Sequence, residues 1–470
     1  MKKLAPEFIN QQQNLLGEEE CQRLLEALEA PQPVSIRLNP FKRMDKVLPD
    51  VIPWCEEGRY LAERPQFTFD PLLHAGCYYV QEASSMFVSQ AIRQYVQTPV
   101  MALDLCAAPG GKSTLLRACL PKGSLLVCNE IMRNRAQVLA ENMVKWGHPD
   151  VMVTNNASED FADCMNCFDV ILTDVPCSGE GMFRKDDEAI DCWSLENVAM
   201  CAERQQHLIY NIWPTLKPGG LLIYSTCTYN AEEDERNVAW IMHEFGAEVL
   251  PVETPDGCEV VGNLIGEDFP VCHFFQHKVR GEGFFMAVLR KPMEAGYSPL
   301  YLPDITRVSK EKKKDKSKLA LPVKDILQTV QPWVLNPEDF YWKLDESGVR
   351  AIPWALAPFY EWALKHKLKV MEVGVLVATL KGKDLIPAHQ LAMSIVLNKD
   401  TFICQEVDYQ QAIAYLRKEI IVLPNAPKGY VLLTYKNFPL GFVKNVGNRA
   451  NNLYPQEWRI RNQFSMSSSK

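Results

Sequence analysis

Between residues 99 and 290, short apolar runs alternate with helix-like stretches, and no other feature constrains the fold of the chain as strongly. Alternation of strands and helices builds a parallel sheet with helices on both faces. We therefore predict an α/β fold with a doubly wound sheet. The predicted strands are Val100–Cys106, Leu125–Glu130, Val151–Thr154, Val170–Asp174 and Leu221–Thr226, and the predicted helices are Lys112–Leu120, Met132–Trp146, Glu196–Leu216 and Glu232–Phe245.

The end of this region changes its pattern. His273–Lys278 and Gly283–Leu289 flank the short segment Val279–Glu282, an arrangement that predicts an antiparallel hairpin. We place the boundaries of this central domain at residues 86–291.

Residues 1–85 predict a separate α+β extension. The spacing of Leu24, Leu25 and Leu28 indicates one apolar helix face, and we expect a helix over residues 6–30 that ends before Pro31. Val34–Pro40 alternates in polarity like a strand.

The remaining chain begins with residues 292–320, where prolines and the charge run Lys310–Lys316 predict a solvated linker. Beyond it we predict an intermediate domain over residues 321–395 and a last domain over residues 396–470. The predicted elements of the last domain are the strands Tyr430–Tyr435 and Phe442–Val446, joined by a turn at Asn437–Gly441.

Composition limits the function classes. A chain of 470 residues, 47% of them hydrophobic, predicts two to four globular domains. The net charge of -8 argues against non-specific coating of nucleic acid but allows a local basic groove. We find no signal peptide or membrane span and expect a cytoplasmic protein without membrane contact. Its 15 cysteines are then thiols, and the pair Cys164 and Cys167 lacks the partner pair of a zinc site, so no metal is expected.

Two features outline a pocket for a nucleoside. The loop from Asp104 to Lys112 follows a predicted strand, opens a helix and contains the small residues that let a ligand approach the backbone. It fits neither the dinucleotide fingerprint nor the P-loop spacing. Glu130 ends the next strand, where a carboxylate can accept hydrogen bonds from a ribose diol.

Two thiols reach the same predicted edge of the sheet. The segment Asp174–Gly181 delivers Asp174 and Cys177, and Ser225–Thr228 delivers Cys227. Most buried cysteines are inert packing residues, but two at strand ends beside a nucleoside pocket favour a chemical role. A thiolate that adds to carbon 6 of cytosine makes carbon 5 nucleophilic, an acid near ring nitrogen 3 stabilises the developing charge, and a second group helps to release the adduct.

These motifs resemble the Nol1/Nop2/Sun family of RNA 5-methylcytosine methyltransferases, and most closely its bacterial RsmF-type branch, which acts on 16S ribosomal RNA of the small subunit. The resemblance covers nearly the whole chain. Further matching segments are Ser35–Asn39, Gln81–Met86, the run from Met182 to Asp186, and Leu440 to Pro455. It implies a Rossmann-like sheet that binds S-adenosyl-L-methionine and a PUA-like module at the carboxyl end.

The resemblance also implies residue roles. Cys227 is the nucleophile, Cys177 assists product release, and Asp174 faces both the cofactor and the target base. Arg135 and Asn156 fall where the family has an arginine near the cofactor and an aspartate near the adenine; a shift by one residue would place Ala157 there instead of Asn156. The cofactor-binding residues implied are Cys106, Ala107, Ala108, Pro109, Gly110, Gly111, Lys112, Glu130, Arg135, Asn156 and Asp174.

RNA contacts are expected from basic and aromatic side chains. Chemistry on a base requires that base to leave its stack, so we expect a single-stranded or locally opened target. Candidate contacts to phosphates are Arg37, Arg184, Lys185, Lys444 and Arg449, with Lys436, Arg459 and Arg461 as further cations and Tyr454 and Trp458 as stacking platforms.

Three other functions are considered. The chain could be a ribosome-assembly factor without catalysis, although Cys227, Cys177, Asp174 and Glu130 are all present. It could methylate transfer RNA. A DNA methyltransferase is disfavoured, because such enzymes attack with the cysteine of a Pro-Cys motif and this chain has a Thr-Cys motif as well.

Overall fold

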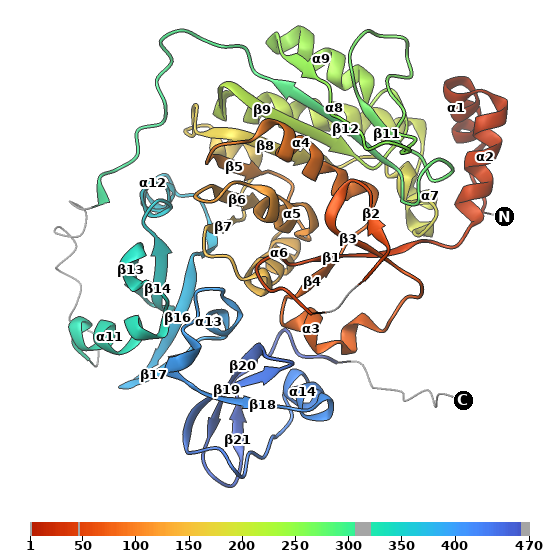
Figure 1. The fold of residues 1–470 in the computed structure, drawn as a ribbon. Coiled ribbons are helices and arrows are strands. Elements are labelled where there is room, and N and C mark those ends of the chain that lie inside the picture. The colour runs from red at the N-terminus through yellow and green to blue at the C-terminus, as the bar shows by residue number, and fades with distance from the viewer. Residues whose placement is uncertain (1, 46–47, 306–320, 462–470) are drawn as a thin grey trace, which may run out of the picture.

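The computed structural model describes residues 2–45, 48–305 and 321–461. Within these residues the chain forms one large central sheet and three four-stranded sheets (Figure 1). No described helix is both long and apolar enough to cross a membrane.

The central sheet confirms the predicted doubly wound α/β fold. Its strand order is β10-β12-β9-β8-β5-β6-β7-β15, and the pairs among β9, β8, β5, β6 and β7 are parallel. The parallel strands are β5 (Met101–Asp104), β6 (Leu125–Asn129), β7 (Val151–Thr154), β8 (Phe168–Asp174) and β9 (Leu216–Thr226). The helices that connect or cover them are α5 (Gly111–Cys119), α6 (Arg133–Trp146), α8 (Leu195–Ile212) and α9 (Glu235–Phe245).

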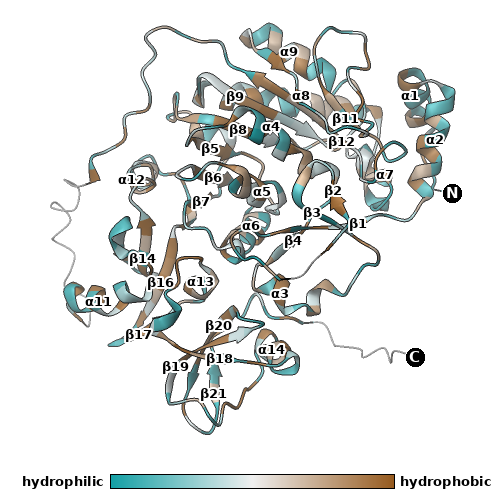
Figure 2. Ribbon diagram, viewed as in Figure 1, coloured by the Kyte–Doolittle hydropathy of each residue, from teal (hydrophilic) through white to brown (hydrophobic). Residues whose placement is uncertain are grey.

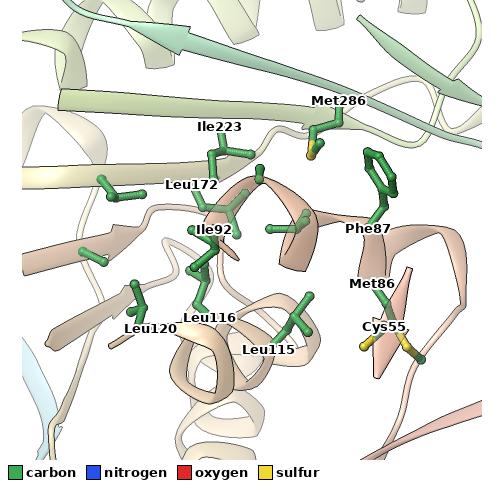
Figure 3. Packing of buried hydrophobic residues seen from close by; sticks show 14 of the residues in the cluster. Cys55, Met86, Phe87, Ile92, Leu115, Leu116, Leu120, Leu172, Ile223 and Met286 are labelled. Carbon is green, nitrogen blue, oxygen red and sulfur yellow. The ribbon is translucent and has the colours of Figure 1, made fainter. Parts of the chain in front are cut away.

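Apolar packing explains why these strands form. The middle residues of β6, from Leu126 to Cys128, are completely buried, as expected for a strand covered on both faces. One core lies between the sheet and helices α4 (Val88–Tyr95) and α5, and Figure 3 shows Ile92, Leu115 and Leu116 packed below Leu172 and Ile223. A second core lies on the opposite face.

The predicted hairpin is confirmed in its pairing but not in its length. Strand β11 (Cys272–Phe274) pairs antiparallel with β12 (Phe284–Arg290), and β12 pairs antiparallel with β9. The first strand ends at Phe274 rather than at Lys278, because the chain turns back through hydrogen bonds from Lys278 and Val279 to the Phe275 carbonyl. Strand β10 (Glu248–Leu250) completes this edge.

The prediction of a single helix over residues 6–30 is wrong in one respect, because this segment forms two helices. α1 (Pro6–Leu16) and α2 (Glu18–Glu29) are separated by Gly17, which has a φ of 84° and a ψ of 165° outside the helical region. The acidic residues from Glu18 to Glu20 form the first turn of α2, where they favour a helix start. Phe8 of α1 packs against Phe183 and Trp193, so the helix pair rests on the loop after β8.

The rest of the extension forms a small sheet in the order β2-β3-β1-β4. The predicted strand at Val34–Pro40 is β1, which ends earlier, at Leu38 (Val34–Leu38). The other strands are β2 (Val51–Ile52), β3 (Cys55–Leu61) and β4 (Tyr78–Val80).

The intermediate region contributes a strand to the central sheet, which the sequence did not lead us to expect. Strand β15 (Val370–Val373) pairs antiparallel with β7 and forms the outer edge of that sheet. Gly374 then turns the chain into a different sheet with a φ of 55°, and a Cβ atom there would lie 2.4 Å from the Ala351 carbonyl oxygen. Helix α12 (Ala357–Lys365) packs onto the same domain through Phe359 and Phe168, whose ring centroids are 6.1 Å apart.

The second sheet of this region has the order β13-β14-β16-β17. Its strands are β13 (Phe340–Asp345), β14 (Gly348–Pro353), β16 (Val375–Lys381) and β17 (Asp384–Pro387). All of β14 is buried, and Figure 2 colours β14 and β16 mainly as hydrophobic, in contrast to the mixed colours of α1 and α2. The charge run Lys310–Lys316 lies outside the described residues.

The last sheet has the order β18-β19-β20-β21. Its strands are β18 (Ile403–Glu406), β19 (Gly429–Tyr435), β20 (Phe438–Asn445) and β21 (Ala450–Asn452). The predicted turn at Asn437–Gly441 is too long, because Lys436 and Asn437, both with positive φ, make the whole reversal. The remaining helices are α3 (Pro71–His74), α7 (Asp187–Cys192), α11 (Val323–Val330), α13 (His389–Met393) and α14 (Tyr409–Leu416).

Candidate active site

The carboxyl ends of the parallel strands place the predicted site residues along one edge of the central sheet. Asp104 ends β5, Glu130 follows β6, and Asp174 ends β8. Cys177 and Cys227 lie in the loops after β8 and β9, which are neighbouring strands. In an open parallel sheet this edge is where ligands bind.

The loop after β5 is fixed by a backbone hydrogen bond to strand β6 and by the start of helix α5. The N–H of Ala107 donates to the Asn129 carbonyl at 2.8 Å, and Gly110, with a φ of 113°, begins helix α5. Asp104 accepts a hydrogen bond from Ser113 Oγ at 2.6 Å, while its Oδ1 atom is buried without a partner among the described residues. Burial raises the pKa of Asp104 to about 7 and that of Cys106 to about 12, so the Cys106 thiol is protonated at neutral pH.

Glu130 and Arg135 lie beside this loop. Glu130 accepts the N–H of Met132 at 2.9 Å, and Arg135 lies 3.5 Å from its second oxygen. Arg135 also donates to the Ala108 carbonyl at 2.9 Å, which ties α6 to the loop. The adjoining Ile131 is 63% exposed, so the carboxylate has an open apolar surface next to it.

The two cysteines predicted to carry the chemistry face each other. Their sulfur atoms are 3.2 Å apart, and the N–H of Cys227 donates to Cys177 Sγ at 3.3 Å. The hydrogen bond with Cys227, together with burial, raises the pKa of Cys177 well above its ordinary value. Cys177 therefore favours its protonated form beside the Cys227 sulfur.

A lysine and a carboxylate connect the cysteines to the loop after β5. Lys112 Nζ lies 2.9 Å from Asp174 Oδ2, and Ser225 Oγ donates to Asp174 Oδ1 at 2.9 Å. Burial alone would lower the pKa of Lys112, but the Asp174 carboxylate raises it, so Lys112 is charged. Asp174 remains half-exposed and can still meet a ligand.

The side chain of Asn156 contacts the intermediate region. Its Oδ1 accepts the N–H of Lys369 at 3.0 Å, and its Nδ2 points to the Lys369 carbonyl at 3.4 Å. Asn155 donates its own N–H to that carbonyl at 2.9 Å. Asn156 is buried, so in this structure its amide holds the start of β15, whereas Ala157 is half-buried beside it.

Two of the residues predicted to contact RNA are buried, so these two predictions are wrong. Arg37 is completely buried; it donates to Gln81 at 2.8 Å and stacks 4.6 Å from the centre of Trp146. Arg184 has a side chain only 6% exposed and pairs with Glu282 at 3.1 Å. Both guanidinium groups hold the protein together and are not free to meet phosphate.

The other candidates differ in exposure. Lys185 and Arg449 are exposed, whereas Lys444 pairs with Asp384 at 2.5 Å. Tyr454 is completely buried, so its prediction as a stacking platform is wrong. Trp458 is half-exposed; Lys436, Arg459 and Arg461 are exposed.

Two buried glutamates near the cysteines were missed by the sequence analysis. Glu180 and Glu233 lie in the loops that follow Cys177 and Cys227, and both are completely inaccessible to solvent. Glu180 belongs to the motif segment Asp174–Gly181 and Glu233 to the predicted helix Glu232–Phe245, but nothing in either segment indicates burial.

Cys164 and Cys167 lie in the apolar core on one face of the sheet. Within the described ranges, no group of three or more His, Cys, Asp or Glu side chains is arranged to hold a metal ion.

Comparison with known protein families gives three matches along the chain. A model described as the N-terminal domain of 16S rRNA methyltransferase RsmF matches residues 4–83. The model of 16S rRNA methyltransferase RsmB/F matches residues 96–290, and the methyltransferase RsmF PUA domain matches residues 403–460.

Curated relatives and solved structures extend these matches. A ribosomal RNA small subunit methyltransferase F from Erwinia tasmaniensis is 30% identical over 96% of each chain. One of the same name from Citrobacter koseri is 32% identical over 86% of this chain and 84% of its own. A methyltransferase homologue from Pyrococcus horikoshii has 27% identity and a TM-score of 0.53 over 62% of this chain and 96% of its own. NSun6 from the same organism, solved with SFG, has 21% identity and a TM-score of 0.53 over 62% of this chain and all of its own.

Proposed function

Because the chain belongs to the ribosomal RNA small subunit methyltransferase F family, we propose that it transfers a methyl group from S-adenosyl-L-methionine to carbon 5 of a cytosine in 16S ribosomal RNA. The name of the family covers methylation of small-subunit ribosomal RNA. The position on the base and the covalent route are our inference, and they rest mainly on the two thiols 3.2 Å apart beside the pair of Lys112 and Asp174.

The residues at the sheet edge fit S-adenosyl-L-methionine. Small residues from Cys106 to Gly111 leave room for a ligand against the backbone, and Glu130 offers a carboxylate to a ribose diol. The exposed Ile131 supplies an apolar surface suited to an adenine ring. When bound, the cofactor supplies an electrophilic methyl group on a sulfonium.

Cys227 begins the proposed reaction. Its thiolate forms a bond to carbon 6 of the cytosine, which moves an electron pair to carbon 5 and makes that carbon the nucleophile for the methyl group. We assign Asp174 to the ring near nitrogen 3, with the ammonium of Lys112, 2.9 Å from its carboxylate, to balance charge. A base then takes the carbon 5 proton, the electron pair of that C–H bond re-forms the double bond between carbons 5 and 6, and the bond from carbon 6 to sulfur breaks so that Cys227 leaves as a thiolate.

Cys177 belongs to this last step. We assign the attack to Cys227 rather than Cys177 because its Thr-Cys motif resembles that of the family's RNA enzymes, and the raised pKa of Cys177 agrees with this assignment. Its position beside Cys227 suits a role in release of the methylated base.

RNA is the proposed partner, bound in part by the PUA module at residues 403–460. Of the basic residues predicted to contact it, the exposed Lys185 and Arg449 keep this proposed role. The target cytosine must leave its stack to reach two half-buried thiols.

The test is transfer of labelled methyl groups to small subunits, 16S ribosomal RNA or transfer RNA from cells that lack the protein, followed by nucleoside analysis. We expect label in 5-methylcytidine from ribosomal RNA, and none with Cys227→Ala, a loss of at least about 10³-fold. Label in transfer RNA alone would contradict the proposal that ribosomal RNA is the substrate. Cofactor binding without label in any RNA would indicate an assembly factor instead.

A further inference from the structure

The two cysteine loops are joined beneath the site by buried carboxylates. Glu180, three residues after Cys177, accepts the N–H of Tyr229 at 2.9 Å and the side-chain amide of Asn230 at 3.1 Å. Both donors belong to the loop of Cys227. Glu180 also accepts Trp193 Nε1 at 2.9 Å, which fixes the direction of its carboxylate.

Glu233 makes the reciprocal connection. It follows Cys227 in the chain and accepts the N–H of Ser178, the residue after Cys177, at 3.0 Å. It also accepts Gln205 Nε2 at 2.7 Å and the Asn230 amide at 2.8 Å. Each loop therefore supplies one carboxylate that binds the backbone of the other loop.

Close packing leaves little freedom between the loops. The N–H of Gly181 donates to the Cys227 carbonyl at 2.8 Å, and a Cβ atom on Gly181 would lie 2.9 Å from that same oxygen. Ser178 Oγ and Thr228 Oγ1 are 3.1 Å apart. A shift of either loop would break several buried hydrogen bonds at once and leave their donors and acceptors unpaired.

Burial separates these glutamates from direct chemistry. Neither has any exposed surface, and none of the ion pairs among the described residues includes them. Burial raises the pKa of both. Burying a carboxylate costs free energy because it loses its hydration. The backbone N–H groups of Tyr229 and Ser178, which these two carboxylates accept, offset that cost.

We propose that Glu180 and Glu233 are positioning residues, which hold the loops of Cys177 and Cys227 at the separation needed for both thiols to act on one cytosine. The inference rests on the proposed function for the role of the thiols, but the spacing itself can be measured without RNA or cofactor.

Phenylarsine oxide measures that spacing. Its arsenic(III) forms two As–S bonds with a pair of thiols and releases its oxygen as water with the two thiol protons, without any change in oxidation state. Wild-type protein should be captured through Cys177 and Cys227, with the bridged pair identified by mass spectrometry and abolished by either Cys→Ala variant.

The test variants are Glu180→Gln and Glu233→Gln, which replace one accepting oxygen by a donor. We expect capture of the pair to slow at least tenfold. We also expect kcat for methylation to fall about 100-fold, as for a misplacement of about 1 Å, with KM for RNA and cofactor unchanged. Glu233→Asp keeps the charge and should recover part of both rates.

The matched control is Glu235→Gln, two residues from Glu233. Glu235 is equally buried but pairs with His273 at 2.8 Å, away from the cysteine loops. Its loss should lower the melting temperature and leave arsenical capture unchanged. If Glu235→Gln slows capture as much as Glu233→Gln, or if the test variants capture and methylate like wild type, the positioning role is wrong. If the test variants slow capture but the wild-type protein does not form 5-methylcytidine, the proposed function is wrong. The role of the two glutamates in spacing the thiols would still stand.

Discussion

The two ends of the ligand-binding edge are supported in different ways. At the β8 and β9 end, Cys177 and Cys227 are held by Glu180 and Glu233, which lie within six residues of them in the chain. At the β6 and β7 end, Asn156 is held by the backbone of Lys369, in a part of the chain that follows the whole central domain.

Because of this difference, the two cysteines and Asn156 should respond to different substitutions. The cysteine end depends on two short motifs, so each motif carries both a reactive group and its support. The cofactor end depends on a strand that arrives from another region, so changes in that region should reach cofactor binding without disturbing the thiols. Three substitutions probe this contrast.

The largest effect is expected from Cys177→Ala at the cysteine end. Attack by Cys227 should proceed and release should fail, so the protein should remain covalently bound to its RNA. Denaturing gel electrophoresis with labelled RNA should show a shifted band that wild type lacks. Cys227→Ala serves as the control and should give neither band nor product; an exchange of the two phenotypes would reverse the assigned roles.

A smaller effect is expected from Glu130→Gln at the cofactor end. Loss of a charged acceptor costs about 1.5 to 3 kcal/mol, so the Kd for S-adenosyl-L-methionine should rise about 10- to 100-fold. Isothermal titration calorimetry measures this directly. Glu141→Gln, on the following helix α6 and paired with Lys145, is the control and should bind normally. Equal binding by Glu130→Gln would remove this residue from the cofactor site.

The smallest effect is expected from Asn156→Ala. Removing the amide leaves the Lys369 N–H without its acceptor, so the free energy of unfolding should fall by about 1 to 3 kcal/mol in urea titrations. Cofactor affinity should fall only a few-fold, roughly 1 kcal/mol. Arsenical capture of the cysteine pair should not change. A slower capture would show that the two ends are coupled, whereas the exposed Asn134→Ala should alter none of these.

The fold was predictable where periodicity is local. The buried strands β5 to β9 follow from short apolar runs, and their ends differ from prediction by a few residues. The break at Gly17 was missed because the predicted helix rested on the spacing of Leu24, Leu25 and Leu28, which lies entirely within α2. Strand β15 was missed because its partner lies in another domain, and pairing of that kind leaves no signal in the strand itself.

The site was predictable in identity but not in environment. Cys177, Cys227, Asp174 and Lys112 were singled out by their motifs, and the structure brings them together. Arg37 and Arg184 were misassigned because an arginine that anchors a core and one that meets a phosphate have the same letter in a sequence. Only tertiary packing decides between the two.

The placement of β15 also constrains how the protein is made. During synthesis the central domain leaves the ribosome before β15 does. One edge of β7 therefore stays unpaired until Val370–Val373 has emerged. An open edge of this kind can pair with other chains, so products that end before this strand carry an aggregation-prone surface. The central sheet is therefore completed only after residue 373 of the 470-residue chain has been translated.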